Sequence, residues 1–158
     1  MRSKELIWIG AVILMLAIGC EKRTPSEQPL PAEGFKAQLV LENPPSAIKS
    51  NLVYKPRVHI KNNSRVLWPS LPGKQGQRYW IRLAYRWHDL QGNFLPVEIV
   101  RTDLPHDLGP NEEVTVTAKI IPPERSGEYL LEIDLVQEEV DWFKNPQSQA
   151  VTIKVRVE

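Results

Sequence analysis

The alternation of apolar and polar residues is the feature that most constrains the fold of this chain. It recurs throughout residues 35–158, and its clearest row is Ile81, Leu83, Tyr85 and Trp87. Successive side chains of a β-strand point to opposite faces, so a period of two predicts strands that each bury one face. Most of the 14 prolines also lie in this region, where they exclude long helices. We therefore expect a nearly all-β domain.

Seven segments carry the alternation, and turns rich in glycine or proline separate them. They lie at residues 37–41, 58–60, 81–87, 94–101, 114–120, 129–135 and 151–157. The turn at residues 89–93 contains Gly92, which can take a positive φ, so the third and fourth segments should form a hairpin. Seven short strands in about 120 residues are typical of an antiparallel sandwich in which two sheets bury one face each.

The Gly-Glu-Tyr sequence at residues 127–129 resembles the tyrosine corner of immunoglobulin-like domains. In that corner the tyrosine hydroxyl bonds to nearby backbone, so we expect Tyr129 to be buried and to bond near the Pro122-Pro123 turn. Leu131 stands where antibody domains have a cysteine, and apolar packing alone must hold the sheets. The expected fold is an immunoglobulin-like antiparallel β-sandwich of about seven strands.

Other segments resemble a small immunoglobulin-like module that bacteria append to glycosyltransferases and methyltransferases. They cover most of residues 50–145 and comprise residues 58–62, 67–69, 81–87, 101–105, 109–110, 127–129, 134–138 and 142–143. The stretch from Asn62 to Trp68-Pro69 is also similar, more distantly, to the four-tryptophan domain of selective-autophagy receptors. These resemblances imply an accessory or recognition module, and neither family supplies a catalytic residue that could be transferred here.

The first twenty residues have the features of a targeting segment. Basic Arg2 and Lys4 precede an apolar run over residues 6–19, and the only cysteine of the chain, Cys20, follows it. As a helix this run would span ~21 Å, less than the ~30 Å hydrocarbon core of a bilayer. Residues 17–20 resemble the lipobox of bacterial lipoproteins, in which the cysteine is lipidated and the chain is cleaved before it. The alternatives are an uncleaved signal anchor and an ordinary cleaved signal.

Lipidation at Cys20 would attach the protein to a membrane of the cell envelope, the outer membrane if the bacterium is Gram-negative. Cleavage would remove three charged residues and bring the formal net charge from +1 to zero, so acyl chains rather than electrostatics would have to hold the protein on the lipid. The proline-rich stretch 21–34 has few apolar residues and should form an extended tether of up to ~40 Å. We expect a signal peptide at 1–19, a lipidated cysteine and tether at 20–34, and the sandwich at 35–158.

The sequence contains no catalytic or metal-binding signature. His59, His88 and His106 share no short metal-binding spacing, and no serine lies in a Gly-x-Ser-x-Gly elbow. Glu132 and Asp134 invite comparison with a glycosidase pair or a calcium site, but both alternate with an inward row and should lie on a solvated outer face. The small net charge does not favour nucleic acid. We therefore predict no enzyme activity, no cofactor, no metal and no nucleic-acid partner.

Aromatic residues are the candidates for ligand binding. Trp87 is in phase with an inward row and should belong to the core. Trp68, Trp142 and Phe143 lie in loop-like stretches, where closing the end of the sandwich competes with ligand contact. Trp80 is out of phase with the inward row and should share the outer face of its strand. The candidate ligand-binding residues are thus Trp68, Trp80, Trp142 and Phe143.

The pairing of strands predicts a charged outer face around Trp80. In the immunoglobulin-like topology the strand with Arg82 and Arg86 pairs with the strand that starts at Tyr129. The two arginines should then face the carboxylates of that strand, and Trp80 should lie beside Leu130.

These observations favour a non-catalytic, lipid-anchored module of the cell envelope that recognises protein or glycan. The alternative is a structural or assembly subunit of an envelope complex, such as polysaccharide export or secretion machinery. A stable subunit would copurify with stoichiometric partners, whereas a sugar-binding module would not.

Overall fold

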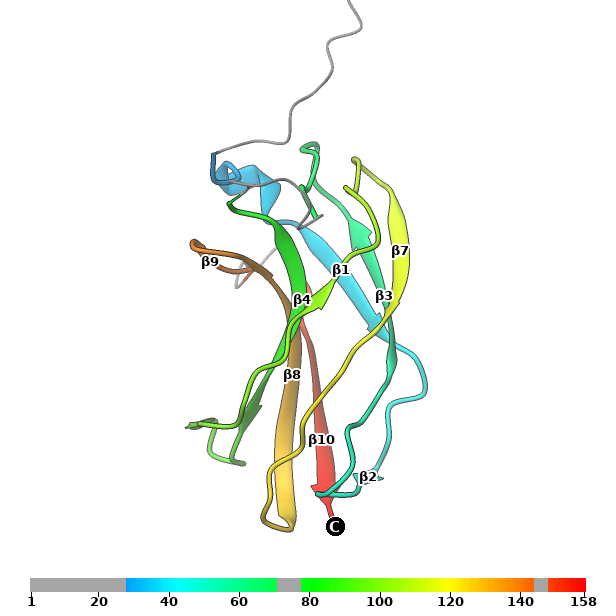
Figure 1. The fold of residues 1–158 in the computed structure, drawn as a ribbon, viewed down its shortest axis with the longest axis vertical. Helices are drawn as coiled ribbons and strands as arrows, with labels where there is room; N and C mark the ends of the chain where they lie inside the picture. The colour runs from blue at the N-terminus through cyan, green and yellow to red at the C-terminus, as the bar shows by residue number, and fades with distance from the viewer. Residues whose placement is uncertain (1–27, 71–77, 144–147) are drawn as a thin grey trace, which may run out of the picture.

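The computed structural model describes residues 28–70, 78–143 and 148–158, in which ten strands form two sheets packed face to face (Figure 1). The all-β antiparallel sandwich predicted from the alternation is confirmed. Cys20, the predicted signal peptide at 1–19 and most of the predicted tether lie outside the described residues. Within the three described stretches, no helix has the length and apolar character needed to cross a membrane.

The small sheet has three antiparallel strands in the order β1-β3-β7. They are β1 (Ala37–Leu41), β3 (Arg57–Asn62) and β7 (Glu113–Thr117). Leu39 lies opposite Ile60, which in turn lies opposite Val114. The inward row of each strand therefore meets the inward row of its neighbour and forms one wall of the core.

The large sheet follows the order β2-β10-β8-β4-β5, with β6 also paired to β4 and β9 to β8. Its strands are β2 (Ala47–Ile48), β4 (Ile81–His88), β5 (Phe94–Leu95), β6 (Thr102–Asp103), β8 (Gly127–Gln137), β9 (Asp141–Trp142) and β10 (Val151–Val157). Only the short β2 runs parallel to its neighbour, β10. Strands β1, β3 and β7 occupy one sheet and β4, β8 and β10 the other, which is the immunoglobulin-like arrangement.

The core lies between the sheets and contains the predicted inward rows. Leu83, Tyr85 and Trp87 are at most 2% exposed, and Leu131 and Ile133 of the adjacent β8 are completely buried. Because β4 and β8 pair along their length, these two rows form the centre of the large sheet's inner wall. The alternation in the sequence therefore identified the core correctly.

The predicted strand at 94–101 is interrupted. Residues 94–95 pair with the end of β4 as the expected hairpin, whereas residues 102–103 pair with its beginning. Pro96 has no N–H to continue the ladder, and Val97 N–H donates instead to the carbonyl of Leu95, 2.8 Å away. The chain therefore leaves the sheet after β5 and returns only at β6.

The prediction for Tyr129 is wrong about its burial, whereas the expected bond from its hydroxyl to backbone is present. Tyr129 is only half-buried, and its hydroxyl donates to the carbonyl of Arg125, two residues after the Pro122-Pro123 turn, at 2.8 Å. The buried Tyr85 donates to the carbonyl of Glu98 at 2.8 Å and accepts the N–H of Ile121 at 2.9 Å. Burial raises the pKa of Tyr85, which keeps this hydroxyl protonated. Tyr129 lies near the start of β8, where its ring packs edge to face on that of Trp87, with the centroids 6.2 Å apart.

The last residues of the predicted tether, from Leu30 to Gly34, pack onto the domain. Leu30 is 7% exposed, and its N–H donates to the side-chain oxygen of buried Gln137 at 3.0 Å. A single 3₁₀ turn, η1 (Ala32–Gly34), follows. The prolines of this stretch suggested an extended spacer, but Leu30 gains burial against the sandwich. The folded part therefore begins at Leu30 instead of Phe35.

Candidate functional site

Two of the predicted ligand-binding residues are buried at the end of the sandwich where Leu30 enters, which we call the proximal end. Trp68 and Phe143 are at most 1% exposed, and their rings meet edge to face with centroids 5.1 Å apart. Phe35 packs on Phe143 at 4.9 Å, and the indole N–H of Trp68 donates to the carbonyl of Gly34 at 2.8 Å. Trp68 and Phe143 therefore close the proximal end and present no surface to a ligand.

The Asn62 to Trp68-Pro69 element has a structural role at the same end. The side-chain amide of Asn62, which is fully buried, donates to the carbonyls of Val66 at 2.8 Å and Leu108 at 2.9 Å. Its side-chain oxygen accepts the N–H of Ser64 at 2.9 Å. Asn62 thus fixes the loop that positions Trp68, which explains why the two residue types occur at this spacing.

The face of the large sheet that points away from the small sheet, here called the outer face, carries the predicted charge pairs. Arg86 lies opposite Glu132 on β8, and their side chains approach to 2.5 Å. His88 Nε2 lies 2.7 Å from the other oxygen of Glu132. The prediction that an arginine faces a carboxylate across this ladder is confirmed at Arg86.

A second cluster of charges lies at the other end of β4. Arg82 is opposite Val136, not a carboxylate, because β4 and β8 are offset by the antiparallel register. Its guanidinium pairs instead with Asp103 of β6 at 2.6 Å and with Glu138 at 3.4 Å. Arg101 also pairs with Glu138, at 2.9 Å. Both signs of charge are therefore neutralised locally.

The prediction that Asp134 lies on a solvated face is wrong. Its side chain is on the outer face of the large sheet, but it is only 1% exposed. Its neighbours Ala84 and Val136 are also buried, at 2% and 4% exposure. The reason lies in β9, which leaves the large sheet on the side away from the small sheet and pairs Trp142 with Val136 (Figure 1). A period of two gives the face that a side chain occupies, but not whether another segment covers that face.

Trp142 and Trp80 are the predicted ligand-binding residues that remain at the surface, both partly exposed. The guanidinium carbon of Arg86 lies 4.1 Å from the centre of the Trp142 ring, within the range of a cation–π contact. Trp80 lies beside Glu138, whose N–H donates to the Trp80 carbonyl at 3.0 Å. The prediction that Trp80 neighbours Leu130 is wrong, because in the antiparallel register Leu130 lies opposite His88.

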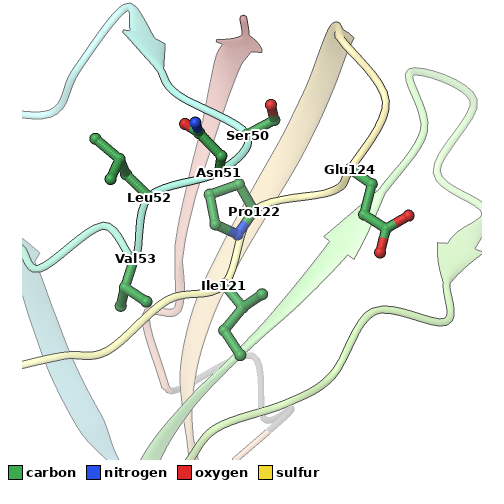
Figure 2. A pocket seen from close by; sticks show the side chains of 7 residues that line it. All are labelled: Ser50, Asn51, Leu52, Val53, Ile121, Pro122 and Glu124. Carbon is green, nitrogen blue, oxygen red and sulfur yellow. The ribbon is translucent and has the colours of Figure 1, made fainter.

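A hollow at the opposite, distal end of the sandwich was not anticipated from the sequence. It has a volume of about 420 Å³ and lies between two loops, as Figure 2 shows. Its lining residues are Ser50, Asn51, Leu52, Val53, Ile121, Pro122 and Glu124. We call it the distal hollow. The only sequence signal was the apolar pair Leu52-Val53, which stands between strand segments and belongs to neither alternating row.

On the open face of the small sheet, a carboxylate, an imidazole and a hydroxyl are hydrogen-bonded in series. This is the order of groups that activates the nucleophile in hydrolases with a catalytic triad. His59 Nε2 lies 2.6 Å from a Glu42 oxygen, and His59 Nδ1 lies 2.6 Å from the Thr115 hydroxyl. The His59 side chain is 51% exposed, and the distal hollow is lined by other residues. His59 and Thr115 lie on the neighbouring strands β3 and β7, and Glu42 directly follows β1, so the chain of hydrogen bonds links the three strands of the small sheet. Within the described residues, no group of three metal-ligating side chains gathers there.

Comparison with known proteins gives no family. No protein-family model matches the chain, and no curated protein is significantly similar to it. The CARDB domain of a Pyrococcus furiosus protein shares 20% identity at a TM-score of 0.45, covering 77% of this chain and 95% of that domain. Spo0M, the sporulation control protein of Bacillus subtilis, shares 15% at 0.48, covering 78% of this chain and 49% of its own. A β-glucosidase from Listeria innocua shares 14% at 0.44, covering 77% of this chain and 16% of the enzyme. None of these likenesses carries a function to this chain.

Proposed function

We propose that this protein is a lipid-anchored, non-catalytic recognition module of the bacterial cell envelope, and that it binds a protein partner through the outer face. The observation that carries the proposal is the stack of Trp142 on Arg86, whose charge is already paired with Glu132. Tryptophan and arginine are the residue types that most often dominate protein interfaces. Here a rigid ladder holds both in place, so little conformational freedom would be lost on binding.

The composition of the outer face favours a protein over a glycan. Arg86 and Glu132 form one paired cluster, and Arg82, Arg101 and Glu138 form another. Alternating charges of both signs suit a partner that carries both signs as well. A neutral sugar would use the aromatic ring but would leave these charges desolvated without compensation.

Lipid attachment at Cys20 would place the proximal end toward the membrane. Leu30 is fixed to the domain, so only the ten residues from Cys20 onward can act as spacer. An extended chain of that length reaches roughly 30 Å, which still lifts the domain clear of the headgroups. The outer face runs along the length of the sandwich and would be accessible from the side.

The anchor is tested with Cys20→Ala. We expect the substituted protein to leave the membrane fraction, because the thiol is the only acylation site and zero net charge provides no electrostatic substitute. Membrane fractionation after a high-salt wash measures this. Retention of the variant in the washed membranes would mean that residues 6–19 act as an uncleaved anchor.

The binding face is tested by copurification of the full-length protein with and without detergent. We expect Trp142→Ala to lose its protein partner, whereas Lys154→Ala, which removes an exposed pair with Glu128 on the same sheet, should keep it. Unchanged thermal midpoints would show that both variants are folded. A partner retained by Trp142→Ala contradicts the proposal. Binding that added envelope polysaccharide abolishes would identify a glycan module, and detergent-stable stoichiometric partners in every variant would favour the assembly-subunit alternative.

A further inference from the structure

We infer that the distal hollow is a docking site for a protein segment that presents an apolar side chain next to a lysine or arginine. This second binding surface lies at the end of the sandwich farthest from Leu30. The inference depends neither on the lipid anchor nor on the outer face. It rests on three observations: fixed walls, exposed apolar side chains and one carboxylate, that of Glu124, which has no ion pair within the described residues.

The first wall of the hollow is held by backbone hydrogen bonds. Tyr54 and Ile120 exchange two of them, each 2.9 Å long, immediately after Val53 and immediately before Ile121. The N–H of Ser50 donates to the carbonyl of Glu158 at 2.8 Å. The loop that carries Leu52 and Val53 is therefore tied at both ends to the sandwich.

The second wall is pinned from inside the core. The N–H of Ile121 donates to the Tyr85 hydroxyl, and its carbonyl accepts the indole N–H of Trp87, both at 2.9 Å. Tyr85 and Trp87 are themselves buried. The hollow is thus preformed, and a ligand would not have to order it.

Two adjacent apolar side chains at this end, those of Leu52 and Val53, are largely exposed to solvent. Leu52 and Val53 are 57% and 49% exposed, and Figure 2 shows both beside the hollow. Leu90 and Phe94 of the hairpin between β4 and β5 are also exposed, at 46% and 52%, but they do not line the hollow. Two adjacent exposed apolar side chains beside a hollow are typical of interaction sites on folded proteins. The volume of about 420 Å³ lies within the roughly 300–1,000 Å³ of ordinary ligand sites.

The negative charge of Glu124 indicates which kind of partner the hollow can bind. Glu124 is the only ionisable residue among its lining residues, and it forms none of the ion pairs found in the described residues. A carboxylate at the rim favours a cation and opposes the phosphate groups of anionic lipids. An apolar side chain flanked by lysine or arginine satisfies both the apolar wall and Glu124, and this combination identifies a protein segment.

The test uses two fluorescein-labelled hexapeptides and the full-length protein in neutral detergent micelles. One peptide has a Leu-Phe pair flanked by lysines, and the other has the same pair flanked by glutamates. Fluorescence anisotropy should give at least about tenfold tighter binding of the lysine peptide. Val53→Lys should weaken that binding about tenfold, because it replaces an apolar contact with a like charge. Glu124→Lys should reverse the preference between the peptides.

Val40→Lys is the matched control, since Val40 is also 49% exposed but lies on β1, away from the hollow. We expect it to leave the affinity unchanged. Equal affinities for the two peptides, equal losses in Val40→Lys and Val53→Lys, or binding to protein-free micelles would each overturn the inference. Self-association that excludes both peptides would overturn it as well and identify a second copy as the occupant. Trp142→Ala should not alter peptide affinity, so failure here is distinguishable from failure of the proposed function.

Discussion

Both ends of the sandwich carry apolar residues in loops, but these residues are buried at the proximal end and exposed at the distal end. At the proximal end, Trp68 and Phe143 stand outside the strand alternation and are completely covered. At the distal end, Leu52 and Val53 also stand outside it and remain about half exposed. The difference is that residues 30–35 fold back onto the proximal rings, whereas no described segment covers the distal loop. An apolar loop residue therefore closes the core where another segment covers it, and remains available for binding where no segment does.

The closed end should respond most strongly to substitution. Trp68→Ala removes a fully buried ring and leaves the carbonyl of Gly34 without its donor. We expect a loss of about 3–5 kcal/mol in the free energy of unfolding. Urea denaturation followed by circular dichroism measures it, with Trp68→Phe as the milder control. A loss below about 1 kcal/mol would contradict the description of this ring as a plug.

Leucines at the two ends allow a direct comparison. Leu30→Ala should cost about 2–3 kcal/mol, because Leu30 is 7% exposed and belongs to the buried hydrophobic cluster. Leu52→Ala should change stability by less than about 0.5 kcal/mol, since Leu52 is 57% exposed. The same denaturation experiment compares the two. Equal losses would mean that the ends do not differ in the way described here.

Two tyrosine-to-phenylalanine substitutions compare the hydroxyl of Tyr85, which holds the distal wall, with that of Tyr129. Tyr85→Phe removes a buried hydroxyl that bonds Glu98 and Ile121, and should cost about 1–2 kcal/mol. Tyr129→Phe removes an exposed hydroxyl on Arg125 and should cost less than about 0.5 kcal/mol. Thermal unfolding monitors both. A larger effect at Tyr129 would mean that its hydroxyl, rather than that of Tyr85, is the more important tyrosine link to the loops.

The smallest effect is expected at the β4–β5 hairpin of the distal end. Hydrogen bonds from the Asn93 side chain, then from nearby N–H groups, hold the pKa of Asp89 below its ordinary value of 3.8. A lowered pKa in the folded state means that the stabilisation is present above the unfolded pKa and is lost as the pH falls through the folded one. A titration of Asp89 by nuclear magnetic resonance should show this, and Asn93→Ala should move the pKa back toward 3.8. An unchanged pKa in that variant would remove Asn93 as the main cause.

Much of the fold could be predicted because burial on one face leaves a period of two. The rows ending at Trp87 and Leu135 were identified, and so was the pairing of their strands, which places Arg86 opposite Glu132. The interruption at Pro96 was missed, although proline cannot donate to a ladder, because the hydrophobic pattern continues past it. The candidate site was predicted only in part, since Trp142 reaches the outer face through a hairpin that the sequence pattern does not reveal.

The sequence by itself determined the all-β class, the inward rows and the face on which each strand residue lies. These properties depend on neighbours one and two positions away, which the alternation records directly. Only the tertiary structure decided that Asp134 is covered, that Trp68 is a plug and that Leu52 stays exposed. Those outcomes depend on segments distant in the chain, such as Leu30 on Gln137 and Trp142 over Arg86, whose approach leaves no periodic trace in the sequence.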